Sequence, residues 1–233
     1  MGTTMHQLSK TLQAIIENKQ AIFFDMDGTI INSEPIHAKT IIKILNDLKI
    51  DLHDLLTRED ELIGKTDLDV YNELVRARPN TTQIISSIEF LAIKNRAIID
   101  ILSNTSDSQI NSLLTPGVLA FIRYLRQHQI DCKLALISAS EPEIVKAMLA
   151  KIGILDSFDL IASNIDTACS KPSPSPYLAA LRFFRLASNK VVTFEDSPTG
   201  IAASLAAGIP TVRISAFTQH RIFEVLPTIL NFL

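Results

Sequence analysis

The chain has 233 residues, of which 47% are hydrophobic and 20% are charged, and its formal net charge is −3. This length is sufficient for one large domain or for a core domain that carries a smaller inserted one. The ordinary composition and the slight negative charge exclude a general basic surface, so we expect no nucleic acid partner.

The sequence also favours an intracellular, unanchored protein. Its apolar runs fall short of the roughly 18 residues that a membrane span needs, and its N-terminus has no signal-peptide core. Cys132 and Cys169 show no metal-binding or redox spacing and fit a reducing compartment. We therefore expect a cytoplasmic protein without a membrane partner, and a monomer is the expected oligomeric state.

The first element with chemical content is an apolar run, AIFF at residues 21–24, which predicts a strand and leads into Asp25 and Asp27. In an extended segment, residues two apart face the same way, with about 6 to 7 Å between their Cα atoms. Two neighbouring carboxylates repel each other, so the pair suits Mg²⁺ binding or a nucleophile beside a proton carrier. Gly28 permits a sharp turn, and Thr29 offers a hydroxyl and an amide there. A calcium loop is excluded because its sixth and twelfth positions are isoleucines.

The pattern of apolar residues changes in the following segment. Between residues 34 and 115, apolar residues recur at spacings of three and four, and strand-like runs are few. Ser33 and Pro35 fit the start of its first helix, and Pro116 marks the return to alternating structure. We therefore expect a core domain of residues 1–33 and 116–233, interrupted by a helical domain of residues 34–115.

A second strand-like run, KLALI at residues 133–137, ends at Ser138. The Ser138 hydroxyl and the nearby backbone N–H groups suit phosphate oxygens, although a serine in this place is also common in a plain turn. Ser140 and Glu143 fit a capping box at the start of the next helix.

Lys171 and a pair of acids complete the candidate site. Lys171 stands in a loop, where an ammonium can stabilise phosphoryl charge only if the fold brings it near the aspartates. A third strand-like run, VVTF at residues 191–194, ends at Glu195 and Asp196, and adjacent acids in this position suit metal ligation. Alternating strands and helices predict an α/β fold with a parallel sheet, whose strands have their carboxyl ends at one edge. We therefore expect the polar clusters to meet there.

These clusters, taken together, resemble the four motifs of the haloacid dehalogenase superfamily in order and spacing. The motifs are DMDGT at residues 25–29, Ser138, Lys171 in KPSP, and EDSPTG at residues 195–200. The helical insertion, with NSEPIH at 32–37 and PGV at 116–118, is similar to that of the β-phosphoglucomutase-like sugar phosphatases and mutases of subfamily I. The resemblance covers about residues 20–215. It implies a three-layer, Rossmann-like core with a parallel sheet and an inserted helical-bundle cap of the C1 type.

The resemblance also implies a role for each motif residue. Asp25 is the expected nucleophile, which forms an aspartyl phosphate, and Asp27 is the expected general acid and then base. Ser138 and Lys171 are expected to hold the phosphoryl oxygens. The expected cofactor is Mg²⁺, with ligands from Asp25, the Asp27 carbonyl, Asp196 and, directly or through a second contact, Glu195. The residues expected to contact the substrate are Gly28, Thr29, Ser33, His37, Gly64, Lys65 and Ala139.

The implied activity is Mg²⁺-dependent hydrolysis of a small phosphomonoester, such as a sugar phosphate, a polyol phosphate or phosphoglycolate. Asp27 disfavours dehalogenation, because dehalogenases of the superfamily lack this acid. A phosphosugar mutase is the nearest alternative, and it needs a cap group for a second phosphate. The loop at residues 63–67 has isoleucine before Gly64 and aspartate where mutases have arginine, although Lys65 can partly substitute.

Three points stay open besides the choice between hydrolysis and mutase activity. His37 matches a hinge histidine that in mutases helps control Asp27, but it also fits a packed helix residue. A receiver domain of a signalling protein uses similar groups, yet it needs adjacent acids at its first strand and has no helical insertion. A phosphate-binding protein without catalytic activity is the third, because a fold does not guarantee activity.

Overall fold

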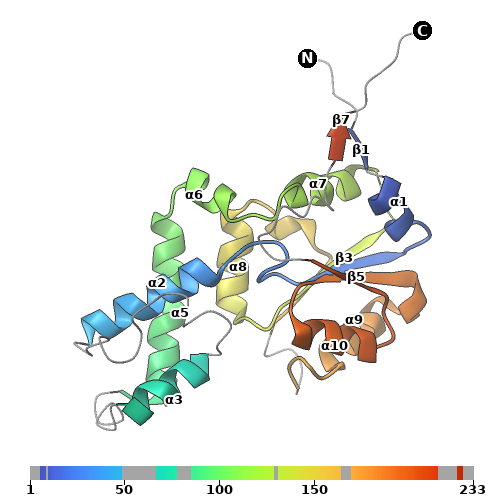
Figure 1. Cartoon of the computed structure of the whole chain (residues 1–233). Helices are drawn as coiled ribbons and strands as arrows, with labels where there is room; N and C mark the ends of the chain where they lie inside the picture. Colours follow the sequence, from blue (N-terminus) through green and yellow to red (C-terminus); the bar gives the residue numbers. More distant parts are fainter. Residues whose placement is uncertain are drawn as a thin grey trace. The chain divides into compact units, whose positions relative to one another are not determined.

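The computed structural model describes residues 6–8, 10–48, 67–77, 85–128, 131–163, 169–214 and 225–227. The chain divides into two units, drawn together in Figure 1. One unit combines Met1–Asn32 with Ile110–Leu233, and the other is Ser33–Gln109. The division expected from the sequence, into a core domain and a helical domain of residues 34–115, stays a prediction.

The larger unit is built on a five-stranded sheet in the order β4-β3-β2-β5-β6, and every neighbouring pair is parallel. The strands are β2 (Ala21–Phe24), β3 (Lys133–Ile137), β4 (Leu160–Ala162), β5 (Val191–Glu195) and β6 (Thr211–Arg213). The three strands expected from the sequence are therefore confirmed, and so is their parallel arrangement. Their nearly continuous apolar runs reflect burial on both faces.

Helices cover both faces of this sheet, which gives the three layers of the predicted fold class (Figure 1). Alternate strand residues, among them Phe23, pack with Tyr177 and Ala203 of helices α9 (Ser175–Phe184) and α10 (Pro198–Ala206). On the opposite face, Phe24 and its neighbour in β5 contact Phe121 of α7 (Val118–His128). This alternation follows from the two-residue period of a strand. The α/β fold class is confirmed.

The described part of the larger unit also contains two further helices and two 3-10 turns. They are α1 (Lys10–Ile16), α8 (Pro142–Lys151) and the 3-10 turns η2 (Leu155–Ser157) and η3 (Ser188–Lys190). A separate antiparallel ribbon pairs β1 (His6–Leu8) with β7 (Val225–Pro227). Helix α10 is followed by Gly208, whose positive φ of 76° suits the turn after a helix.

All the secondary-structure elements described in the smaller unit are helices. It contains α2 (Glu34–Asp47), α3 (Asp67–Ala77) and α5 (Ser87–Asn104), and α6 (Asp107–Ser112) crosses its boundary. Ser33 is the N-cap of α2 and Pro35 lies in its first turn, as predicted. The core of the unit is formed by Ala38, Ile41, Ile44, Leu45, Val70, Tyr71, Ile85, Phe90 and Ala97. Within the described ranges, every helix is too short or too polar to cross a membrane.

Candidate active site

The central strands bring three of the predicted residues to one edge of the sheet. Phe24 of β2 is paired with Leu136 of β3 on one side and with Phe194 of β5 on the other. The next residues along the three strands, Asp25, Ile137 and Glu195, therefore lie side by side, and the Asp25 N–H donates to the Phe194 carbonyl at 3.0 Å. Ser138 directly follows Ile137, so it joins Asp25 and Glu195 at the carboxyl ends of the strands, where parallel sheets usually bind ligands.

Lys171 enters this edge from the loop before α9. Its Nζ donates to Asp25 Oδ1 at 2.6 Å, to Glu195 Oε1 at 2.6 Å and to the Ile137 carbonyl at 2.9 Å. These three bonds use the three donors of an ammonium group. Burial alone would lower the pKa of Lys171, but the charge of Asp25, together with Tyr177 and Glu195, outweighs it and raises the pKa. Lys171 is therefore a fixed positive charge.

Glu195 fixes the position of the Lys171 ammonium. It is fully buried, and its Oε1 accepts from Lys171 and, at 3.3 Å, from the Tyr177 hydroxyl. Its Oε2 accepts from the backbone N–H of Ser197 at 2.9 Å and from the Ser197 hydroxyl at 3.0 Å. Gly200 approaches so closely that an added Cβ would overlap with the Glu195 carboxylate. The fold therefore holds Glu195 with both carboxylate oxygens engaged.

Asp25, Glu195 and Asp196 form the cluster that can hold a metal ion. Their carboxylate oxygens lie within 4.8 Å of one another. The Thr29 hydroxyl donates to Asp196 Oδ1 at 3.2 Å and orients that side chain. Gly28 adopts a positive φ of 87°, and a Cβ there would overlap with Asp196, so both backbone and space require glycine. This set of hard oxygen donors fits Mg²⁺.

The electrostatics of the cluster favour an added positive charge. Burial, assisted by the charge of Glu195, raises the pKa of Asp196 to about 6. Burial also raises the pKa of Asp25 well above its usual range, and the charges of Glu195 and Asp27 add to this effect although Lys171 opposes it. One ammonium does not neutralise these carboxylates, so the site draws in either a proton or a metal cation.

Asp27 is held by two hydroxyl groups at the end of β3. The Ser140 hydroxyl donates to Asp27 Oδ2 at 2.7 Å, and the Ser138 hydroxyl donates to the same oxygen at 3.3 Å. The predicted capping box of Ser140 and Glu143 is wrong: α8 begins at Pro142, and its N-cap is Glu141, which makes no side-chain cap hydrogen bond. The Ser140 hydroxyl is used by Asp27 instead. Sequence reasoning missed this contact, although the spacing of two from Ser138 is a signal for it.

The other predicted substrate contacts lie in different parts of the chain. Ala139 is exposed beside Ser138, whereas Ser33 and His37 belong to the smaller unit. Within that unit, His37 Nδ1 lies 2.9 Å from Nζ of the buried Lys94. Gly64 and Lys65 lie outside the described residues, so their role stays a prediction.

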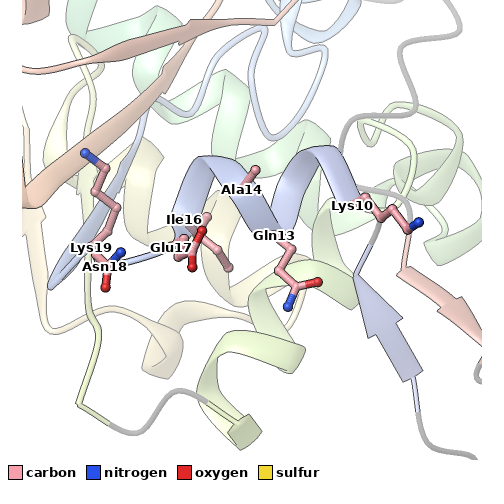
Figure 2. Close-up of a pocket in the computed structure, with 7 residues that line it drawn as sticks. All are labelled: Lys10, Gln13, Ala14, Ile16, Glu17, Asn18 and Lys19. Atoms are coloured by element: carbon pink, nitrogen blue, oxygen red, sulfur yellow. The ribbon is translucent and has the colours of Figure 1, made fainter.

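A pocket of about 430 Å³ lies elsewhere, around α1 and the residues before β2 (Figure 2). It is lined by Lys10, Gln13, Ala14, Ile16, Glu17, Asn18 and Lys19. The end of α1 leads into the amino end of β2, so this pocket lies away from the edge that carries Asp25. Lys19 donates to the Asn189 carbonyl at 2.9 Å. Apart from the buried Ile16, these side chains are exposed or partly exposed, and they do not form a convergent site of the kind that contains Asp25.

Comparisons with known proteins agree with this geometry. The family model for haloacid dehalogenase-like hydrolases matches residues 19–208. The chain is 26% identical over 204 residues to fructose-1-phosphate phosphatase YqaB of Escherichia coli K12, covering 85% of this chain and 97% of that protein. It is 28% identical over 203 residues to hexitol phosphatase B of the same organism, covering 84% and 83%.

The fold is also similar to a solved structure. CbbY from Rhodobacter sphaeroides, in complex with phosphate, superposes with a TM-score of 0.71 at 23% identity, covering 87% of this chain and 89% of that one. The resemblance predicted from the four motifs is thereby confirmed, as is the α/β fold that it implied. The chain belongs to the haloacid dehalogenase-like hydrolases.

Proposed function

We propose that the protein is a Mg²⁺-dependent phosphatase, which hydrolyses a small phosphomonoester through an aspartyl phosphate on Asp25. The observation that carries this proposal is the position of Lys171, whose ammonium is fixed between the Asp25 and Glu195 carboxylates at 2.6 Å from each. A buried lysine held in this way cannot swing to solvent. It orients the Asp25 carboxylate and offers positive charge to an incoming phosphoryl group.

The chemistry assigns one task to each aspartate. An Asp25 carboxylate oxygen attacks phosphorus while the bond from phosphorus to the substrate oxygen breaks, and the acid form of Asp27 gives its proton to that oxygen. Water then attacks the phosphorus, Asp27 takes up a proton from it, and the bond between phosphorus and the Asp25 oxygen breaks. The products are the alcohol and inorganic phosphate, and the Asp25 carboxylate is restored.

Mg²⁺ is the cofactor that the acidic cluster supports. Asp25 and Asp196 would hold it, since their carboxylate oxygens lie close together, and the Asp27 carbonyl is the further ligand that the family resemblance implies. Glu195 belongs to the same cluster, but its hydrogen bonds to Lys171, Tyr177 and Ser197 favour a supporting role through the lysine. When bound, the ion would neutralise negative charge on the carboxylates and the phosphoryl oxygens.

The names of the relatives support a phosphorylated sugar or polyol as the substrate class. The proposal is tested by incubating the purified chain with sugar phosphates, polyol phosphates, phosphoglycolate and nucleotides, and by measuring free phosphate. We expect release from a small group of sugar or polyol monophosphates with Mg²⁺, and loss of that release after chelation. Absence of Mg²⁺-dependent release from all of them would overturn the proposal.

The same screen separates a phosphatase from a phosphosugar mutase. A mutase needs a sugar bisphosphate to restore its phosphorylated aspartate, whereas a phosphatase uses water. We therefore expect phosphate release to be independent of added bisphosphate, and no phosphosugar isomer to form. Isomer formation that requires catalytic bisphosphate would replace the phosphatase assignment with the mutase.

A further inference from the structure

The contacts of Asp27 are unequal. Its Oδ2 accepts from the Ser140 hydroxyl at 2.7 Å and from the Ser138 hydroxyl at 3.3 Å. A hydroxyl bound to a carboxylate lies at about 2.5 to 2.7 Å when the bond is charge-assisted, and ordinary O–H···O bonds end near 3.0 Å. The Ser140 bond is therefore the strong one, and the Ser138 bond is weak.

The two serines also differ in what else they do. Ser138 is buried at the end of β3, and its hydroxyl oxygen accepts from the Ser140 N–H at 3.0 Å. If Ser138 binds a phosphoryl oxygen, as the family resemblance implies, its hydroxyl proton turns away from Asp27. Ser140 is one residue beyond the predicted substrate contact Ala139, and its hydroxyl can keep its bond to Asp27 during that change.

We propose that Ser140 is the positioning residue for Asp27, an inference that rests on the proposed phosphatase mechanism. The hydrogen bond to Oδ2 fixes the rotation of the Asp27 carboxyl about its Cβ–Cγ bond, a torsion that is otherwise broad. The acid proton of Asp27 is thereby directed at the leaving oxygen. Ser140 keeps its own proton throughout, so Asp27 alone exchanges a proton with the substrate oxygen and with water.

This assignment predicts an effect that depends on the leaving group. The value of kcat/KM reports the steps up to phosphoryl transfer to Asp25, in which Asp27 protonates the departing oxygen. An alkyl phosphate needs that proton, whereas an aryl phosphate such as 4-nitrophenyl phosphate leaves largely without it. Loss of positioning should therefore lower kcat/KM for the alkyl substrate more than for the aryl one.

The experiment compares both substrates on the wild-type chain, Ser140→Ala, Ser140→Thr and the control Ser157→Ala. Ser157 lies in η2, before the amino end of β4, and its substitution removes a serine hydroxyl outside the site. For Ser140→Ala we expect kcat/KM to fall by about tenfold or more on the alkyl phosphate and by less than about threefold on the aryl phosphate, a modest share of what misplacement of reacting groups can cost. Ser140→Thr, which keeps the hydroxyl, should restore the wild-type ratio, and Ser157→Ala should leave it unchanged.

Equal losses on both substrates, or no loss on either, would overturn the role of Ser140. A ratio that Ser140→Thr fails to restore would overturn it as well, because the hydroxyl would then not be the group that matters. Ser140 is partly exposed, so its truncation leaves no buried cavity, and an unchanged unfolding midpoint verifies the fold. Failure of the proposed function is a separate result, because it would leave the wild-type chain itself without Mg²⁺-dependent phosphatase activity.

Discussion

The close approach of Gly200 to Glu195 makes Gly200→Ala an informative perturbation. Gly200 lies in the first turn of α10, where alanine is ordinarily the better helix former by about 1 kcal/mol. Here an added Cβ would overlap with the Glu195 carboxylate. That carboxylate cannot move aside cheaply, because Lys171, Tyr177 and Ser197 all donate hydrogen bonds to it.

The gain in helix propensity is smaller than the cost of displacing Glu195, so the net change in the free energy of unfolding is a loss. Displacing Glu195 breaks its pair with Lys171, and breaking a buried ion pair by removing one partner costs about 3 to 5 kcal/mol. Subtracting the gain in helix propensity, we expect Gly200→Ala to lower the free energy of unfolding by about 2 to 4 kcal/mol. Phosphatase activity should fall with it, since Lys171 loses one of its two carboxylate partners.

Urea unfolding of the wild type, Gly200→Ala and Gly153→Ala measures this effect. Gly153 follows α8, and a Cβ there meets no atom within 4 Å, so its alanine variant carries only the strain of a positive φ and should keep full activity. In a Glu195→Ala background, Gly200→Ala should become stabilising by about 1 kcal/mol, because the overlapping carboxylate is gone. Stabilisation by Gly200→Ala in the wild-type background would refute the reasoning.

Two further predictions concern Asp27 and Asp159. Asp27→Asn should lower kcat/KM for alkyl phosphates by about 10²- to 10⁴-fold and for aryl phosphates much less, because only alkyl phosphates need a general acid. Steady-state assays on both substrates measure this difference, and equal losses would argue against the acid role of Asp27. Partial burial would raise the pKa of Asp159, but the hydrogen bond from the Leu134 N–H at 2.9 Å and the Arg126 guanidinium at 2.8 Å outweigh it and lower the pKa. The stabilisation by this carboxylate is therefore present above its unfolded pKa of about 3.9 and is lost as the pH falls through the lowered folded value. Asp159→Asn should thus lower the free energy of unfolding by about 0.5 to 1.5 kcal/mol at pH 7. Denaturant titrations should show that this difference between wild type and variant shrinks below about pH 4. A difference that persists at lower pH would contradict this account.

The strands and their polar ends could be predicted because burial leaves a direct trace in sequence. Residues 21–24, 133–137 and 191–194 are apolar runs because the sheet is covered on both faces, and each run ends where the chain reaches the polar edge. Parallel strands end at the same edge whatever their order, so the meeting of Asp25 with Glu195 did not require knowledge of the sheet order. The short strands β4 and β6 left no comparable trace, since each has three residues.

Ser140 shows where local reasoning fails. A serine three residues before a glutamate is a common helix start, and that pattern was sufficient to assign Ser140 to a cap. The structure uses its hydroxyl for Asp27, which is 113 residues away in sequence. A local propensity signal carries no information on such a partner, and a charged acceptor at 2.7 Å outweighs a cap bond.

Glu195 illustrates a different limit. Adjacent acids at a strand end indicate a metal site, but the sequence does not tell which acid faces the metal and which supports a neighbouring group. The distinction depends on donors from α9 and from the start of α10, namely Tyr177 and Ser197. Only the packed structure shows that these groups converge on Glu195.

The central claim is that Asp25 becomes phosphorylated, and acid quenching of the wild-type chain during turnover with Mg²⁺ and a sugar phosphate tests it most directly. Acid preserves an acyl phosphate, so mass spectrometry of peptides from the quenched protein locates the added phosphoryl group. We predict one phosphoryl group on the peptide that contains Asp25, removed by hydroxylamine and absent from Asp25→Asn. Turnover without any phosphorylated protein, or a phosphoryl group on another residue such as Ser138, would contradict the account.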